Sequence, residues 1–401
     1  MARKVGIYGV LAYLIYGLFI YWYLFYFSSS ALPFEYEGTA ADPATFLNSR
    51  ELMLSEEYSK IRNLLFFLST PFEWLVYLFV LITGLSRIFS KWADETAKFK
   101  WLKTPIYAFW LSLFAFLITL PLQYVSYSIS KAYNISTQSF PSWMKDELID
   151  FWLNFGSMAI MAAAIYWLIK RSRKRWWFYF WLLSVPFTLF IMFIRPVIID
   201  PLYNDFYPLK DKQLEEKILQ LASKADIPAE HVFEVNMSEK TNALNAYVTG
   251  IGSNSRIVLW DTTLTRLDDD EILFIMAHEM AHYVEKHLYI GIGGYLLLSL
   301  AGLYLISRLM NAMIAKWGNV FKVQGVGHIS SFPLFLMLLS MFLFASSPLS
   351  NLVSRYQETR ADRYAIELTE NKEAGVRTFQ ELTKAGLSQV NPPLLVKIFR
   401  Y

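Results

Sequence analysis

Long hydrophobic runs alternate with short polar segments along the whole chain. Seven of these runs are long enough to cross a lipid bilayer as helices, which takes roughly 20 residues each. They lie near 5–27, 71–90, 105–128, 149–169, 176–199, 288–307 and 331–351. The first run is too long for the core of a signal peptide, so we interpret it as a membrane anchor. The pattern predicts an integral membrane protein with seven transmembrane helices.

Two stretches, 200–287 and 352–401, have the pattern of a soluble domain. In the first, apolar residues recur at helical spacing from Leu214 to Ala222, and Pro228 closes this helical region. Three strand-like pieces follow, with the sequences HVFEVNM, ALNAYVTG and SRIVLW. The last two are joined by residues 251–254 in the manner of a hairpin. The second stretch, from LVSRYQETRADRYAIELTE onward, has a helical pattern.

A further helix is predicted for DDDEILFIMAHEMAHYVEKH, just before the sixth hydrophobic run. Asp268 is suited to cap its first turn, and Glu271, three residues later, completes a capping box. We therefore expect a mainly α integral membrane protein that carries a small α+β domain split by the last two spans. Its parts are helices one to five in 1–199, the first half of the small domain in 200–287, helices six and seven in 288–351, and the second half in 352–401.

Composition supports a membrane protein and limits its chemistry. Of the 401 residues, 55% are hydrophobic and only 18% are charged, whereas soluble domains carry about 25% charged residues. A net charge of +3 without a basic tail gives no indication of nucleic acid as a partner. The chain has no cysteine, which excludes disulfides and thiolate metal sites. Any metal must therefore be held by histidine and carboxylate groups.

The sequence HEMAH places two histidines four residues apart on a predicted helix. His278 and His282 then project from one helical face and can present two imidazoles to one Zn²⁺. Glu279 lies beside them, where it can take a proton from a water molecule that zinc activates. The motif is short, and a surface helix with two solvated histidines is the alternative.

A catalytic zinc site needs a third protein ligand. Position 288 is leucine, so the chain lacks the later histidine of the longer H-E-x-x-H-x-x-G-x-x-H motif, and His231 and His328 are expected to be ordinary histidines. Glu358 and Asp362 are again four residues apart and follow the seventh span. Glu358 can complete a His₂Glu site, and Asp362 can accept a hydrogen bond from a ligand imidazole. A solvated charged helix face is the alternative.

Five motifs occur together in the chain: PLYNDFYPL, NAYVTG, RIVLWDTTL, HEMAH and SRYQETRAD. Their order and spacing resemble those of the type I CAAX prenyl protease family of membrane-embedded zinc metallopeptidases, with the HtpX-like peptidases as more distant relatives. The motifs cover about 200–370, and the seven-span layout extends the likeness over nearly the whole chain. The resemblance implies seven helices that enclose a chamber around a gluzincin-like peptidase domain.

The resemblance also implies roles for individual residues. One Zn²⁺ per chain is bound by His278, His282 and Glu358, with Glu279 as the general base and Asp362 in support. The strand that holds Asn245 and Ala246 pairs with an extended substrate, and the alternative for Asn245 is a hairpin or turn residue. Arg355 pairs with a carboxylate of the site or with the substrate. His287 matches a family position, but we assign it no task.

One departure from the family concerns the end of the chain. The family typically has a Ser/Thr-His-Pro-Pro segment followed by an arginine, and its histidine is thought to donate to the developing oxyanion. Here NPPLLVKIFRY ends at Tyr401, where that segment would begin. Either the polypeptide was shortened or this member does without the segment. We expect the missing donor to lower the rate by about 10²–10³.

The predicted function is zinc-dependent hydrolysis of peptide bonds in membrane-associated or lipidated, CAAX-like polypeptides. Two alternatives remain: a seven-span transporter or receptor-like protein with an incidental or regulatory metal site, and a catalytically silent scaffold. We expect a multi-pass protein of the cell membrane if the source is bacterial, and of the endoplasmic reticulum otherwise. Glu73 and Arg195 either line the chamber or extend to the membrane surface.

Charge along the chain conflicts with the family over orientation. Lysine and arginine flank the first run on its N-terminal side, follow the second run, and fill the turn 170–175. All these positions share one side if the seven spans are correct. The positive-inside rule then puts the N-terminus in the cytoplasm and the small domain outside. The eukaryotic members of the family have the catalytic domain in the cytosol. We favour the orientation given by the charge, with the family's orientation as the alternative.

Overall fold

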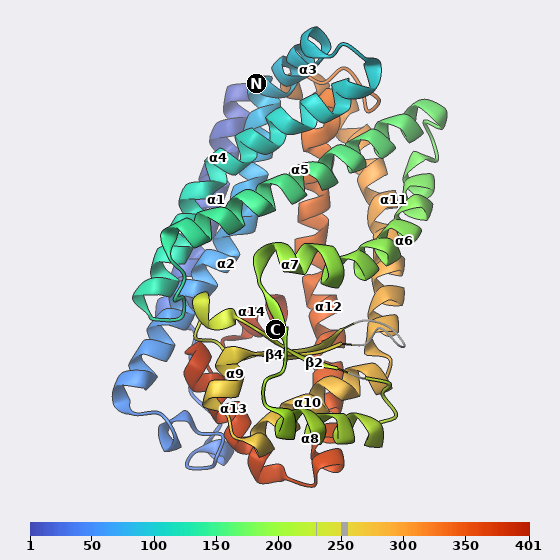
Figure 1. Ribbon diagram of the computed structural model, residues 1–401. Coiled ribbons are helices and arrows are strands. Elements are labelled where there is room, and N and C mark those ends of the chain that lie inside the picture. Colours follow the sequence, from blue (N-terminus) through green and yellow to red (C-terminus); the bar gives the residue numbers. More distant parts are fainter. Residues whose placement is uncertain (230, 250–255) are drawn as a thin grey trace.

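The computed structural model describes residues 1–229, 231–249 and 256–401 (Figure 1). Seven helices in this part of the chain are long and apolar enough to cross a membrane, which confirms the predicted number. They lie within Ala2–Phe27, Ser49–Thr83, Lys100–Ala132, Phe140–Arg171, Trp176–Tyr203, His287–Phe321 and Ile329–Thr369. Figure 1 shows the N-terminus at one end of this bundle and a small sheet with short helices at the other.

Most spans consist of a single long helix. Their elements are α1 (Ala2–Trp22), α2 (Ser49–Thr83), α4 (Lys103–Ala132), α5 (Phe140–Arg171), α6 (Trp176–Ile194), α11 (His287–Phe321) and α12 (Phe332–Thr369). A π-helical turn at Arg195–Ile199 leads from α6 into the short α7 (Asp200–Tyr203). Helix α12 runs without a break from the membrane into the small domain, so the predicted division at residue 351 falls inside one helix.

The prediction for the second span was wrong in its C-terminal half. It extended to residue 90, but α2 ends at Thr83, and Leu85–Thr96 forms the separate helix α3. Gly84 between them has a φ of 84°, a left-handed conformation that glycine adopts without a Cβ clash. Hydropathy alone does not register this turn, because apolar residues continue on both sides of it. The chain therefore leaves the bundle seven residues earlier than its hydrophobicity indicates.

A four-stranded sheet forms the centre of the small domain, in the order β1-β2-β4-β3. Its strands are β1 (Phe206–Pro208), β2 (Val232–Val235), β3 (Ala246–Thr249) and β4 (Arg256–Trp260). The last three confirm the predicted strands, whereas β1 was not predicted. Strands β3 and β4 are antiparallel, as in a hairpin, and the expected connection at residues 251–254 lies outside the described residues. Strand β3 stands at the edge of the sheet.

Helices cover the sheet and join it to the membrane bundle. They are α8 (Lys212–Lys224), α9 (Asp261–Arg266), α10 (Asp269–Val284), α13 (Lys372–Gly386) and α14 (Leu394–Phe399). The predicted capping box begins α10: Asp268 accepts a hydrogen bond from the Glu271 N–H, and Glu271 accepts one from the Asp268 N–H. Phe274, Met276 and Met280 of α10 are buried in one core with α8 and the sheet. This packing fixes the helix that carries HEMAH.

One cavity lies between the bundle and the small domain, and a second lies within the bundle. The larger has a volume of about 1360 Å³ and is lined by residues of β3, α10 and the α6–α7 segment, including Arg195. A second cavity of about 350 Å³ lies between α2, α4 and α5 and contains Glu73 in its wall. Asp150 borders both. Arg195 thus lies in the wall of the larger cavity and Glu73 in the wall of the second, as expected for residues that line a chamber enclosed by the helices.

Candidate metal centre

Three residues predicted from the sequence converge on one point. His278 and His282 are one helical turn apart on α10, and their Nε2 atoms lie 3.3 Å from each other. Glu358 arrives from α12, with its Oε2 3.2 Å from His278 Nε2 and 3.9 Å from His282 Nε2. One ligand atom from each residue lies within 4.8 Å of the other two, close enough to surround a single ion.

Asp362 supports the first histidine, as its position one turn beyond Glu358 indicated. Its Oδ1 lies 2.9 Å from His278 Nδ1, on the opposite side of the ring from Glu358. Burial disfavours the charged imidazole, but the hydrogen bonds with Asp362 and Glu358 outweigh burial and raise the pKa of His278 to about 9. When His278 binds a metal through Nε2, Nδ1 carries the proton and donates it to this carboxylate.

The second histidine has a support that the sequence did not reveal. His282 Nδ1 lies 3.0 Å from Nδ1 of His287, which is only 5% exposed. His287 Nε2 lies 3.0 Å from Glu285 Oε2, and Arg360 of α12 donates two hydrogen bonds of 2.7 Å to the same carboxylate. With His282 bound to a metal through Nε2, its Nδ1–H donates to His287, and the His287 Nε2–H donates to Glu285.

A break in the helix brings His287 into this position. Helix α10 ends at Val284 and α11 begins at His287, and Lys286 between them has a φ of 57°. In one continuous helix, residues five positions apart point in different directions. The left-handed Lys286 turns the chain so that the first residue of a membrane span contacts a ligand histidine. In the sequence, only the match of His287 to a family position signalled a role, and that match does not place its ring.

Glu279 occupies the position expected of a base. It borders the larger cavity together with His282 and Glu358. Burial chiefly raises the pKa of Glu279, His278 counteracts this, and Glu358 adds to it, for a value of about 7. A cation held by the two histidines and Glu358 would lower that value by its own charge. A carboxyl group with a pKa near neutrality can accept and return a proton in one reaction.

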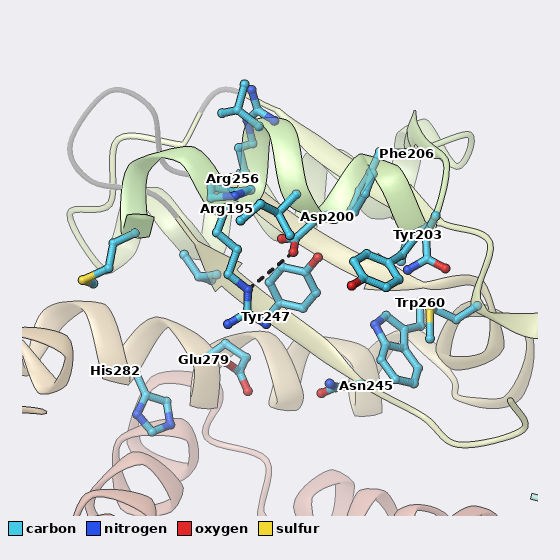
Figure 2. A pocket seen from close by; sticks show the side chains of 18 of the residues that line it. Arg195, Asp200, Tyr203, Phe206, Asn245, Tyr247, Arg256, Trp260, Glu279 and His282 are labelled. Atoms are coloured by element: carbon cyan, nitrogen blue, oxygen red, sulfur yellow. Dashed lines mark ion pairs between the residues drawn. The ribbon is translucent and has the colours of Figure 1, made fainter. Parts of the chain in front are cut away.

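Strand β3 borders the cavity on the side facing α10. Figure 2 shows Asn245 and Glu279 beneath Tyr247, with His282 further along the same helix. The Asn245 Oδ1 accepts a hydrogen bond of 2.9 Å from the Ala246 N–H, which fixes the amide group with its NH₂ end available to donate. Thr263 holds the Asn245 backbone through its hydroxyl group, at 2.9 Å from N and 2.8 Å from O.

Arg355 is directed elsewhere. Its guanidinium donates to the backbone carbonyls of Lys397, at 2.7 Å, and of Tyr401. These contacts fasten α14 to α12, and Arg355 does not border the larger cavity. The structure thus brings His278, His282, Glu279, Glu358, Asp362 and Asn245 to one region and leaves Arg355 outside it. Ala246 follows Asn245 on β3, but its side chain is buried in the core of the small domain and does not border the cavity. His231 and His328 also lie outside the site.

The donor set fits a zinc ion. Two imidazoles and one carboxylate are the protein ligands of one class of catalytic zinc site, which keeps a further position open for water or substrate. Burial lowers the pKa of His282, which favours the neutral form that metals bind. Each imidazole has a hydrogen-bond partner at its other nitrogen, an arrangement typical of metal-binding histidines.

Comparisons with known proteins place the chain in a family. Residues 208–398 match the model of peptidase family M48, and residues 37–205 match the CAAX prenyl protease N-terminal region of five membrane helices. The Bacillus subtilis protein "Uncharacterized metalloprotease YhfN" is 57% identical over 97% of this chain and 92% of its own length. The chain belongs to peptidase family M48. It is a membrane metalloprotease of the CAAX prenyl protease type, as the five motifs predicted.

Sequence identity to proteins named CAAX prenyl protease 1 is lower. CAAX prenyl protease 1 of Saccharomyces cerevisiae is 28% identical over 73% of this chain and 67% of its own length. The homologue in Dictyostelium discoideum is 32% identical over 61% of this chain and 58% of its own length. The crystal structure of S. mikatae Ste24p has the same fold, with a TM-score of 0.79 over the whole chain and 95% of its own length, at 21% identity.

Proposed function

We propose that this M48 member is a zinc-dependent endopeptidase that cleaves membrane-associated or lipidated polypeptides at the His278–His282–Glu358 centre. The observation that carries the proposal is the convergence of three ligand atoms within 4.8 Å, beside a half-buried glutamate and an edge strand. Family membership supports peptide or protein substrates. Relatives named CAAX prenyl proteases support a lipidated substrate.

Each residue has a distinct task in this proposal. A zinc ion bound by the three ligands would supply Lewis acidity to the scissile carbonyl and to the attacking water. Glu279 accepts the proton of the attacking water and returns it to the leaving amine. Asp362 and His287 hold the ligand imidazoles in the tautomer that leaves Nε2 free. The free edge of β3 pairs with the substrate backbone, and the Asn245 amide donates to a substrate carbonyl.

The chamber explains why a lipidated substrate suits this centre. The larger cavity is bordered both by polar residues of the small domain and by apolar residues: Met192 and Phe193 at the end of α6, and Val197 in the π-helical turn that follows. A polypeptide attached to a lipid can thus reach the zinc-binding residues while its lipid remains against apolar helices. We expect the substrate to be an extended segment close to its site of lipid attachment.

Glu279→Gln tests the mechanism because it removes the base and keeps the side-chain shape. We expect zinc content to stay at one ion per chain and hydrolysis of a fluorogenic lipidated peptide to fall by about 10²–10⁴. Removal of zinc with a chelator should abolish hydrolysis, and added zinc should restore it in the wild type alone. Hydrolysis by Glu279→Gln at the wild-type rate would contradict the role of Glu279. A wild type without hydrolysis would favour a catalytically silent scaffold.

A further inference from the structure

A second polar hollow lies at the end of the bundle opposite to the metal centre. It has a volume of about 370 Å³ and is formed where α3, α4, α5 and the segment before α12 meet. Figure 1 shows α3 at this end and α10 at the other. We call it the basic hollow, after the charged residues and the histidine in its wall: Asp94, Lys100, Lys103, Lys170 and His328.

Positive charge exceeds negative charge in the basic hollow. Lys103 pairs with Asp94 at 2.6 Å. Lys100 and Lys170 take part in no ion pair within the described part of the chain. Two ammonium groups from different helices therefore face one cavity without a counter-ion from the protein. Like charges brought together in this way favour a bound anion.

The start of α4 adds to the attraction for an anion. A 3-10 turn, Lys100–Leu102, runs directly into this 30-residue helix at Lys103, and neither has a side-chain cap. Lys100, Lys103 and Thr104 at this start lie in the wall of the basic hollow. The first N–H groups of a helix lack partners within the helix and carry a partial positive charge. Backbone donors and lysine ammonium groups together suit a phosphate group, which accepts several hydrogen bonds.

The position of the basic hollow relative to the membrane indicates which kind of molecule would carry such a phosphate. The spans Lys100–Ala132, Phe140–Arg171 and Ile329–Thr369 each have one end at this level. Phe99 and Trp101, next to Lys100, are 59% and 71% exposed, as aromatic side chains are in the interfacial region of a membrane. Lysine-rich pockets between transmembrane helices at this depth bind the headgroups of anionic lipids.

We propose that the basic hollow is a binding site for the phosphate headgroup of an anionic phospholipid. Lys100 and Lys170 bind the phosphate, with the uncapped start of α4 beneath it. The lipid's acyl chains lie along the apolar surface of the bundle. This site is independent of the proposed zinc chemistry, because it lies at the opposite end of the helices.

Native mass spectrometry of the full chain in detergent, titrated with phosphatidylglycerol or phosphatidylcholine, tests the proposal. We expect the wild type to prefer phosphatidylglycerol. The double variant Lys100→Gln/Lys170→Gln should weaken phosphatidylglycerol binding by about 25-fold, since each lysine near a membrane surface contributes about five-fold. Equal binding of the two lipids by the wild type, or an unchanged preference in the double variant, would overturn the proposal.

Two controls separate charge from folding. Lys100→Arg/Lys170→Arg keeps both charges and should keep the preference. Lys174→Gln removes an exposed charge in the turn after α5, outside the basic hollow, and should have less than a two-fold effect. Displacement of phosphatidylglycerol by an equal concentration of inorganic phosphate would overturn the assignment to a lipid and indicate a free-phosphate site.

Discussion

At the scale of single residues, His287 is the feature that most changes the picture of the metal centre. Its ring links His282 to the Glu285–Arg360 ion pair and so connects a proposed ligand to two membrane helices. Partners of metal-binding histidines typically contribute 10–100-fold to metal affinity. His287 should therefore act as a positioning residue, even though it is not a ligand itself.

Substitutions of His287 distinguish this role from simple packing. His287→Leu should lower zinc affinity by about 10–100-fold, because His282 loses the acceptor for its Nδ1–H. His287→Asn places an oxygen close to the position of Nδ1 and should restore most of the affinity. Zinc affinity is measured by competition with a chelating indicator. Equal losses in the two variants would mean that His287 only fills space.

Zinc binding should also depend on pH through His278. The pKa of this residue is raised to about 9 in the metal-free protein, so below pH 9 zinc must displace a proton. The affinity of the protein for zinc should fall about ten-fold for each pH unit as the pH decreases from 9, and it should be constant above pH 9. In Asp362→Asn the hydrogen bond that raises the pKa of His278 is weakened. The pH below which zinc affinity begins to fall should therefore be lower in this variant. Affinities independent of pH between 6 and 9 would refute this.

At the scale of elements, the position of α10 depends on a close contact with α13. A Cβ added to Gly375 of α13 would lie 2.6 Å from the ring of Phe274, which is buried on α10. Glycine therefore allows the helix that carries HEMAH to approach α13 closely. No pattern of hydrophobic residues predicts this requirement, because alanine fits the same periodicity.

Gly375→Ala should destabilise the protein by about 1–3 kcal/mol through overpacking, despite the better helix propensity of alanine. Gly156→Ala is the matched control, because Gly156 also lies within a helix and its Cβ would meet no atom within 4 Å. Thermal unfolding of both variants in the same detergent gives the comparison. A Gly375→Ala variant as stable as Gly156→Ala would show that α13 can shift at little cost.

At the scale of the whole molecule, the distribution of charge predicts an orientation. The structure gathers Lys100, Lys103 and Lys170 at the end of the bundle that also holds the N-terminus, opposite to α10. By the positive-inside rule this end faces the cytoplasm, and the metal centre faces outward. In the orientation expected from the eukaryotic members of the family, the lysine-rich end would face outward and the metal centre would face the cytosol.

Single cysteines can report on orientation, because the chain has none of its own. Lys212→Cys introduces a thiol on the exposed start of α8, and Lys174→Cys introduces one in the turn at the opposite end. We expect a membrane-impermeant maleimide to label Lys212→Cys on intact cells and Lys174→Cys only after lysis. The reverse pattern would place the metal centre in the cytosol.

The sequence alone determined the features that depend on local patterns. Hydrophobic length predicts seven spans, because a helix must cover the thickness of the bilayer. The four-residue spacings in HEMAH and in Glu358–Asp362 predict shared helical faces, and Asp268 with Glu271 predicts the start of α10. All three depend on contacts within one turn of helix or on the bilayer as a solvent.

Only the tertiary structure decided how distant segments meet. It ended α2 at Gly84 and brought His287 to His282 through the turn at Lys286. It also directed Arg355 to α14 and collected three lysines from separate elements around the basic hollow. These outcomes depend on single left-handed residues and on long-range packing, which leave no periodic signal in the sequence. The ligands of the metal centre could therefore be named from the sequence, whereas the partners that hold them required the fold.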